Sequence, residues 1–418
     1  MHLVFLNQYY PPDAAPTGVM LEAVANELVT QGHSVTILCT EGGGYASASA
    51  PPPSTTDRPL ADHGPLRIIR IPALRFGRGS FIGKLADYLS YYLGVLWRLL
   101  FLHPRPDRII ALTTPPYLSL LARICSKLRR ADHAHWVMDL YPDVMTAHGM
   151  LREGGLIHRL LAILARWGFG GRRCAAILTL GPDMAERIDL LTASPRHAAP
   201  ASWIPLWSGT DEESDPSDLS VTDRRHSMGW PDNSLVVMYS GNMGLGHRFG
   251  EILSLIPQFA PSPSTQAPSP VFAFFGAGKR RAEIASFIAQ NQNLPAELHD
   301  YAPSDILPAH LRSADVHLAS LAPEWTGTMV PSKLQGIFHA ARPVIFIGDS
   351  RSSIGRWVLE SGGGWVVPPG DISALNQAIQ EALDPHTRLT RGRSAKAFAQ
   401  SHFQRTTNAR KVADTFAH

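Results

Sequence analysis

The stretch Thr326-Gly-Thr-Met-Val-Pro-Ser-Lys-Leu-Gln-Gly-Ile-Phe-His-Ala-Ala-Arg-Pro-Val-Ile345 decides the fold of the second half of the chain. It predicts a loop, then a helix with Pro331 in its first turn, then the start of a buried strand. Ser332 and Lys333 fall at the helix N-terminus, where free backbone N–H groups and the helix dipole attract anions. The stretch therefore indicates a β/α unit with an anion-binding helix end. An ordinary β/α unit with one surface lysine is the alternative.

Short apolar runs alternate with helical patterns on both sides of this stretch, as in parallel β/α units. The predicted strands of the first set are Leu3–Leu6, Val35–Cys39, Arg108–Leu112, Trp136–Met138 and Ala175–Thr179; those of the second set are Leu235–Tyr239, Val271–Phe275, Val316–Ala319, Val344–Ile347 and Gly364–Val367. A polar stretch near 209–232 separates the two sets. We therefore expect an α/β protein with two Rossmann-like domains facing across a cleft, at residues 1–205 and 206–395, and a helical segment at 396–418. Ala46–Leu66 and Pro257–Pro270 are expected to be surface loops.

Two glycine-rich segments follow strands of the second set. They are Tyr239-Ser-Gly-Asn-Met-Gly-Leu-Gly246 and Phe274-Phe-Gly-Ala-Gly-Lys-Arg-Arg281. Glycine lets a backbone take positive φ and approach a phosphate closely. Neither segment is the dinucleotide fingerprint, because Phe249 stands where G-x-G-x-x-G read from Gly244 needs its third glycine. The pattern disfavours a dehydrogenase. With Lys333 it favours a nucleotide-sugar site at the carboxyl edge of a parallel sheet.

The Pro-Ser-Lys-Leu motif at 331–334 and the Ser-Gly-Asn-Met-Gly string at 240–244 resemble family 4 glycosyltransferases of the GT-B fold. The resemblance is to the branch that builds bacterial surface polysaccharides, including colanic acid. The long loop Asn7–Gly18 resembles the family's Tyr-x-Pro…Thr-Gly loop, and residues 300–302 match the turn that borders the base. The donor-binding residues that the resemblance implies are Gly18, Gly241, Asn242, Gly244, Gly276, Gly278, Tyr301, Ser332 and Lys333. It also implies that the final helix crosses back onto the first domain.

The chain departs from the family at its usual catalytic carboxylates. Most members carry E-x7-E, whereas Thr328 and Gly336 occupy the two positions here. Glu324, four residues upstream, is a candidate substitute. In the first half many relatives have His-Asp where this chain has Met138-Asp139. Asp139 is therefore our candidate for orienting or deprotonating the acceptor, and a helix-cap or turn role is the alternative.

Composition limits the class of protein and its partners. The 418 residues are 44% apolar and 17% charged, which is an ordinary globular balance. Cys39, Cys125 and Cys174 are scattered without metal-ligand spacing, which fits a reducing compartment. His133 and His135 flank an apolar strand and are expected in the core or on the surface. No Asp-x-Asp motif occurs in the sequence, so we expect a metal-independent enzyme without a cofactor.

Charge and apolar helices indicate an anionic partner for the first half. Residues 1–205 carry 20 Lys+Arg against 15 Asp+Glu, hence +5, and the remainder carries 18 against 20, hence −2. No basic stripe with stacking aromatics points to nucleic acid. Phe81–Leu102 is apolar but too short in its uncharged part to span a bilayer, so a buried helix or a helix on the membrane surface is expected before a true span. Leu156–Arg173 is a second interfacial or packed helix. The N-terminus lacks the pattern of a signal peptide.

The resemblance implies a glycosyltransferase that moves a sugar from a nucleotide-diphosphate sugar, with a UDP-sugar favoured. It implies retention of anomeric configuration and a polyprenyl-diphosphate-linked saccharide as acceptor. We expect the protein in the cytoplasm, peripheral on the inner face of the cytoplasmic membrane. A nucleotide-sugar epimerase of the same fold and a non-catalytic sugar-nucleotide-binding assembly subunit remain alternatives.

Overall fold

The computed structural model describes residues 1–13, 15–41, 57–58, 65–74, 76, 81–193, 199–208, 217–260 and 270–418. These residues form two compact units. The first comprises Met1–Pro205, Gly327–Met329 and Thr406–His418, and the second comprises Leu206–Thr326 and Val330–Arg405. The predicted loops Ala46–Leu66 and Pro257–Pro270 lie largely outside the described residues.

The first unit is built on an 8-stranded sheet of order β3-β4-β2-β1-β5-β6-β7-β8. Its strands are β1 (His2–Leu6), β2 (Ser34–Thr40), β3 (Asp57–Arg58), β4 (Leu66–Ile71), β5 (Arg108–Ala111), β6 (Asp132–Trp136), β7 (Cys174–Thr179) and β8 (Ala201–Trp203). Its helices are α1 (Pro16–Thr30), α2 (Phe81–Phe101), α3 (Leu118–Arg129), α4 (Asp143–Ala147), α5 (Leu156–Phe169), α6 (Pro182–Thr192) and α15 (Arg405–Ala417), the last beginning at the final residue of the second unit. All strand pairs are parallel except β3 with β4.

Alternate residues of β1 face two different helix layers, because successive side chains of a strand point to opposite faces. Val4 and Leu6 join a buried cluster with α2 and α3. Phe5 instead packs edge-to-face on Phe416 of α15, with ring centroids 6.0 Å apart. Trp136 of β6 packs on the same Phe416. The C-terminal helix therefore completes the core of the first unit.

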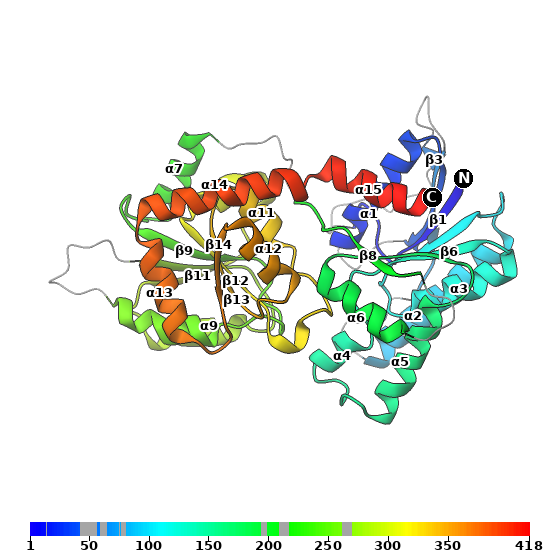
Figure 1. The fold of residues 1–418 in the computed structure, drawn as a ribbon, viewed down its shortest axis with the longest axis horizontal. Coiled ribbons are helices and arrows are strands. Elements are labelled where there is room, and N and C mark those ends of the chain that lie inside the picture. The colour runs from blue at the N-terminus through cyan, green and yellow to red at the C-terminus, as the bar shows by residue number, and fades with distance from the viewer. Residues whose placement is uncertain are drawn as a thin grey trace. The chain divides into compact units, whose positions relative to one another are not determined.

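The second unit is built on a fully parallel 6-stranded sheet of order β11-β10-β9-β12-β13-β14. Its strands are β9 (Leu235–Ser240), β10 (Pro270–Phe275), β11 (Ala296–His299), β12 (Val316–Ser320), β13 (Val344–Ile347) and β14 (Gly364–Val367). Its helices are α7 (Asp218–Ser227), α8 (Gly250–Leu255), α9 (Arg281–Gln290), α10 (Leu307–Ser313), α11 (Lys333–His339), α12 (Ser353–Ser361), α13 (Ile372–Ala382) and α14 (Pro385–His402), with 3₁₀ turns at Ile256–Phe259, Ser304–Ile306 and Pro323–Trp325. In Figure 1, α14 lies along α11 and α12, which it contacts.

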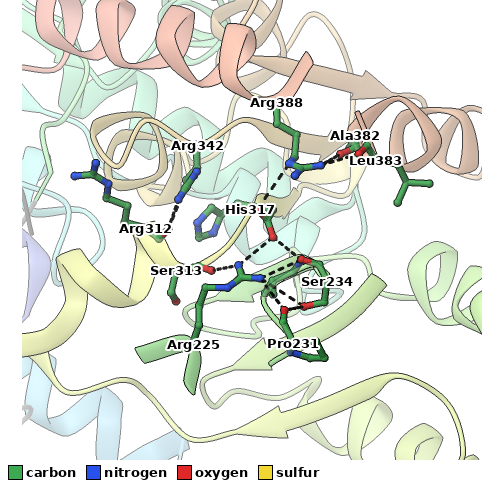
Figure 2. Close-up of polar contacts among 12 residues, drawn as sticks. Arg225, Pro231, Ser234, Arg312, Ser313, His317, Arg342, Ala382, Leu383 and Arg388 are labelled. Atoms are coloured by element: carbon green, nitrogen blue, oxygen red, sulfur yellow. Dashed lines mark hydrogen bonds and ion pairs between the residues drawn. The ribbon is translucent and has the colours of Figure 1, made fainter. Parts of the chain in front are cut away.

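Arginines gather where the strands of this second sheet begin (Figure 2). Asp315, just before β12, accepts from Arg225 at 3.1 Å and from the backbone N–H of Val236 at 2.9 Å, and it lies 3.7 Å from Arg388. The remaining guanidinium N–H groups donate to backbone carbonyls. Arg342, for example, donates to the carbonyl of Arg312 through two nitrogens. Arg225, Arg342 and Arg388, together with Asp315, are called here the amino-edge arginine cluster. The cluster connects α7, α10, α13 and α14 to the sheet.

The two-sheet α/β architecture agrees with the sequence prediction, and several boundaries differ from it. β6 spans Asp132–Trp136, so the prediction of a strand at Trp136–Met138 was too far toward the C-terminus. Helix α11 begins at Lys333, so Pro331 precedes the helix. The expected boundary at 395/396 falls inside α14, which belongs to the second unit, and α15 is the helix that joins the first. The strands β3, β4, β8 and β11 were not predicted.

Candidate functional site

The order of the second sheet creates a place for a ligand. Numbered from β9 in chain order, its strands run 3-2-1-4-5-6, the doubly wound arrangement in which the connections leave in opposite directions from β9 and β12. Ligands of such sheets bind beyond the carboxyl ends of the two strands at this reversal. Ser240 ends β9 and Ser320 ends β12, and the segments that follow them carry the predicted donor residues.

The glycine-rich segments after β9 and β10 are bonded to each other. The N–H of Gly241 donates to Phe275, that of Met243 to Ala277 at 2.7 Å, and that of Arg280 back to the carbonyl of Met243. Gly241, Gly276 and Gly278 have φ of 133°, 131° and 141°. A Cβ on Gly276 would strike the carbonyl oxygen of Gly241, and one on Gly278 would strike that of Met243. These glycines therefore allow the backbones of the two loops to approach each other closely.

Lys333 lies over this pair of loops. Its side chain passes so close to Gly241 that a Cβ there would be 2.6 Å from the lysine Cε. The ammonium donates to the Tyr239 hydroxyl and, at 3.0 Å, to the carbonyl of Asn242, and its Nζ is 3.1 Å from His247 Nε2. It also lies 4.1 Å from the centroid of the Tyr239 ring. These contacts fix the charge at the carboxyl end of β9.

The contacts of Lys333 are all with neutral groups. His247 makes a second hydrogen bond, in which Nδ1–H donates to the carbonyl of Ser320 at 2.7 Å, and burial together with the Lys333 charge lowers the pKa of His247 to about 3. The imidazole is therefore uncharged near neutrality. Burial lowers the pKa of Lys333 to about 7, and no carboxylate of the described residues forms an ion pair with it. An anion beside the ammonium would raise that pKa and be held by it.

The other predicted donor residues lie around the same loops. Tyr301 is exposed after β11, and its hydroxyl donates to the carbonyl of Ala277. Gly244 leaves room for a side chain up to the amide of Asn242, and Ser332 is an exposed N-cap without a capping bond of its own. Of the three basic residues after Gly278, Arg280 pairs with Glu283, and Arg281 pairs with Asp300. Lys279 is exposed.

Gly18 occupies a different position from the one predicted. It lies in the first turn of α1, which begins at Pro16, and so inside a helix and not in the predicted loop Asn7–Gly18. A Cβ on Gly18 would be 3.0 Å from the carbonyl oxygen of Tyr9 and 3.1 Å from the Cα of Tyr10. The glycine thus allows α1 to pack against its own preceding loop.

Asp139 follows β6 at the carboxyl edge of the first sheet. Its backbone N–H donates to the Thr113 hydroxyl at 3.2 Å, and it forms an isolated antiparallel bridge with Met329. The side chain lines a cavity of about 20 Å³, room for about one water molecule, together with Tyr117, Tyr141 and His135. Burial raises the pKa of Asp139 to about 6, the range that suits a general base near neutral pH.

The positions of the missing E-x7-E carboxylates are closed by packing. Thr328 is fully buried in the first unit, and its carbonyl accepts from the N–H of Leu140 at 2.8 Å. A Cβ on Gly336 would meet a methyl group of Leu311 at 3.2 Å, so a longer side chain would displace it. Glu324 is exposed in the 3₁₀ turn Pro323–Trp325 of the second unit.

Sequence reasoning missed two groups of side chains. Tyr239 and His247 flank the glycine-rich segment, and nothing in their spacing marks them as partners of a lysine some 90 residues later. His133, His135 and Cys174 come together across β6 and β7. Their separation in sequence hides this cluster, because a parallel pair of strands aligns His133 with Cys174.

Comparisons with known proteins agree with this architecture. Residues 17–201 match the family described as glycosyl transferase 4-like domain. The chain is 22% identical over 379 residues to the colanic acid biosynthesis glycosyl transferase WcaI of Escherichia coli (strain K12), with 90% of each chain covered.

Two solved structures align with nearly the whole chain. WaaG, a glycosyltransferase involved in lipopolysaccharide biosynthesis, aligns with a TM-score of 0.66 and 16% identity over 99% of each chain. HepE of Anabaena in complex with UDP-glucose aligns with a TM-score of 0.68 and 16% identity over 100% of this chain and 99% of the other. The chain therefore has the GT-B fold and the enzyme class of a glycosyltransferase, and its residues 17–201 match a glycosyl transferase 4-like domain.

Proposed function

We propose that this enzyme transfers a sugar from a UDP-sugar to a lipid-linked saccharide, at the surface of an anionic membrane, during the assembly of a bacterial surface polysaccharide. The observation that carries the proposal is Lys333, a cation held only by neutral groups beside two glycine loops at the carboxyl edge of a doubly wound sheet. The polysaccharide setting is supported by WcaI and WaaG, which are named for such pathways.

The donor half of the proposal follows from electrostatics. A leaving nucleoside diphosphate gains negative charge in the transition state, and a preorganised cation stabilises it. Lys333 supplies that charge, and the exposed Tyr301 beside Gly276 offers a ring for stacking against a base. UDP is favoured because HepE, a structural neighbour, binds UDP and UDP-glucose. No metal ion is required by this arrangement.

The acceptor half rests on Asp139. A carboxylate with a raised pKa in a small cavity is suited to accept a proton from an attacking hydroxyl. With the two glutamate positions filled by Thr328 and Gly336, our candidates for the roles of base and transition-state stabiliser are Asp139 and the exposed Glu324. We propose Asp139 for the first role and retention of anomeric configuration for the product.

The proposed contact with a membrane rests on an apolar surface of the first unit. Leu85, Leu89, Leu93, Trp97 and Phe101 recur every four residues along α2 and are all more than half exposed. Leu156, Ile157, Leu160 and Ile163 of α5 are likewise more than half exposed. Both helices contact α3, which adds Ile124 and Leu128. Exposed apolar patches of this extent mark a binding surface.

Basic residues accompany this α2–α3–α5 surface. Lys84 and Arg98 lie on α2, Lys127 on α3, and Arg159 and Arg166 on α5. Apolar stripes flanked by Lys and Arg are the pattern of helices that lie in a lipid interface. The other face of α2 is buried through Tyr91, Val95 and Leu99, which agrees with the buried interpretation of Phe81–Leu102. We propose the interfacial role for the exposed face. Among the described helices, none combines the length and hydropathy needed to cross a bilayer.

Donor binding is tested by thermal shift with UDP-, GDP- and ADP-sugars, followed by hydrolysis and transfer assays on the sugars that bind. A UDP-sugar at 100 times its Kd should stabilise the fold by about 2.7 kcal/mol. The proposal fails for the donor if no nucleotide sugar raises the melting temperature. It fails for UDP alone if only a GDP- or ADP-sugar does so.

Asp139→Asn tests the base. The substitution keeps the side-chain shape and removes the proton acceptor, so transfer should fall roughly 10²–10⁴-fold while UDP-sugar affinity stays unchanged. Wild-type turnover by this variant would remove Asp139 from the mechanism. Glu324→Gln, assayed in parallel, tests the second carboxylate, and the product's anomeric configuration is read by NMR.

Vesicle sedimentation tests the membrane surface. The protein should bind vesicles rich in anionic phospholipid at low salt and be partly released at high salt, because salt screens the charge attraction. Leu93→Glu with Trp97→Glu should abolish binding. Leu389→Glu, at a 53% exposed site in the second unit, is the matched control and should bind normally. Equal binding by both variants would exclude this surface.

A further inference from the structure

Three metal-ligating side chains meet in the first unit, and one of them, His135, also lines the cavity of Asp139. One ring nitrogen of His133, one of His135 and the sulfur of Cys174 all lie within 4.8 Å of one another. His133 and His135 point to the same face of β6 because they are two residues apart. Cys174 begins the neighbouring strand β7, where it aligns with His133 just before a register shift. The grouping follows from strand pairing, since sequence spacing does not show it.

The tautomer of His133 can be assigned from its partners. Its Nδ1 lies 3.2 Å from the hydroxyl of Ser126, and that hydroxyl donates its only proton to the carbonyl of Arg123 at 2.8 Å. The Ser126 oxygen therefore accepts from Nδ1–H. Nε2 is left with a lone pair, buried and without a hydrogen-bond partner. A histidine whose second nitrogen is fixed as an N–H donor is the usual arrangement of a metal ligand.

His135 is buried with both ring nitrogens unpartnered. Only 1% of its surface is exposed, and its contacts with His133 and Phe169 are edge-to-face ring contacts at 5.2 Å, which leave the nitrogens without hydrogen bonds. The carbonyl of Gly168 is near enough to orient one N–H. A neutral imidazole left in this state costs free energy on folding, and a bound cation would recover it.

Cys174 provides the third ligand. It forms no disulfide, the residue is half-buried, and its thiol donates weakly to the carbonyl of Ala176 at 4.0 Å. Burial raises the pKa of Cys174 to about 11, and the guanidinium of Arg123 opposes that rise by favouring the thiolate. A thiolate beside two imidazoles is a soft ligand set, which selects thiophilic ions over Mg²⁺ and Ca²⁺.

We propose that His133, His135 and Cys174 form a binding site for one Zn²⁺ ion. Three protein ligands with an open fourth position are a common zinc arrangement. The thiolate and Zn²⁺ together carry one positive charge, and Arg123 and Lys127 of α3 oppose it. Asp132, which begins β6, offsets part of that repulsion.

The ion would join β6 to β7 at their register shift and hold them against α3 and α5, the helices of the apolar surface. Its role is then structural. It is independent of the proposed donor chemistry, which lies in the second unit.

Cobalt substitution tests the site directly. The full-length protein, stripped with a chelator under reducing conditions, is titrated with Co²⁺ and then with Zn²⁺. We expect one Co²⁺ per chain, a thiolate-to-cobalt charge-transfer band, displacement by Zn²⁺, and no competition from Mg²⁺. Zn²⁺ should also raise the melting temperature of the stripped protein.

Matched variants separate this site from the rest of the chain. Cys174→Ser should abolish the charge-transfer band and weaken Zn²⁺ binding at least roughly 100-fold, since loss of an outer partner alone costs 10–100-fold. Cys125→Ala, at a buried thiol of α3, should leave both unchanged. His135→Asn should weaken binding to a similar extent, with circular dichroism to check folding. No band in the wild type, or a band that survives Cys174→Ser, would overturn the proposal.

Discussion

The two edges of the second sheet carry cations in opposite ways. At the amino edge, Arg225 and Arg388 surround Asp315, and spare guanidinium N–H groups reach backbone carbonyls (Figure 2). At the carboxyl edge, among the described residues, Lys333 meets only a phenol, an imidazole and a carbonyl. The first cluster contains a counter-charge of its own, Asp315, and its role is architectural. The second keeps its net charge, and a cation held in that state is prepared for an external anion.

Asp315→Asn should have the largest effect of the changes considered for this sheet. Among the described residues it removes the one carboxylate that pairs with Arg225, and it leaves partly buried guanidinium groups without a counter-charge. Loss of one partner of a fully buried pair costs about 3–5 kcal/mol, so this partly buried pair should lose somewhat less, measured as the free energy of unfolding in urea. Asp300→Asn, whose carboxylate is 92% exposed beside Arg281, should change it little. Equal losses would show that the amino-edge arginine cluster is no more than a surface network.

Gly276→Ala should disrupt the packing of the two glycine-rich loops at the carboxyl edge. The new methyl group meets the carbonyl oxygen of Gly241, at a φ of 131° that only glycine adopts readily. We expect a loss of roughly 3 kcal/mol of stability from overpacking and backbone strain together. Gly370→Ala, with a φ of 86° and open space around it, isolates the backbone term and should cost about 1 kcal/mol. If the two variants lose the same stability, the loops are not interlocked as described.

Lys333→Met should separate binding from stability. Loss of the charge should weaken UDP-sugar binding by roughly 1.5–3 kcal/mol, or about 10- to 150-fold, in calorimetry. The free energy of unfolding should not fall, because the methionine removes a buried cation that has no counter-charge. A variant that loses stability and keeps its donor affinity would place Lys333 with the structural arginines.

The pH dependence of the wild type gives the smallest effect. The folded pKa of Lys333, about 7, lies below its ordinary value of 10.5, so the unfolded chain binds more protons between these values and stability should rise with pH across that window. The ammonium is the form that binds a diphosphate. Affinity for UDP-glucose should therefore fall about tenfold between pH 6 and pH 8. Both trends should disappear in Lys333→Met, and their persistence there would assign them to another group.

The sequence was sufficient for the architecture of both sheets and for the segments that meet at the carboxyl edge of the second. Apolar runs such as Val344–Ile347 are typical of buried parallel strands. A glycine after such a strand indicates a turn or a backbone with positive φ. Short or half-buried strands such as β8 and β11 lack such a run and were missed. The prediction of β6 was misplaced because the histidines of this strand are buried, which their hydropathy does not indicate.

The chemistry of the site was less accessible to sequence analysis. Glycine at 241, 276 and 278 was interpreted as space for a phosphate, whereas the structure fills that space with a neighbouring loop and Lys333. The environment of a charged group depends on residues from distant segments; His247, for example, is a partner of Lys333. Local spacing records none of these contacts. Resemblance to a family indicates which positions to inspect, and at Gly336 a longer side chain would have to displace the methyl group of Leu311.

The route of the chain between the two units has a practical consequence for protein engineering. The polypeptide passes from one unit to the other after Pro205, after Thr326, after Met329 and after Arg405. A fragment cut at residue 205 would therefore lack Gly327–Met329, which bridges Asp139, and α15, whose Phe416 covers Phe5 and Trp136. Exchange of donor specificity between relatives by joining halves at a single junction would leave these surfaces bare. A functional chimaera needs the tripeptide and the last helix to travel with the first unit.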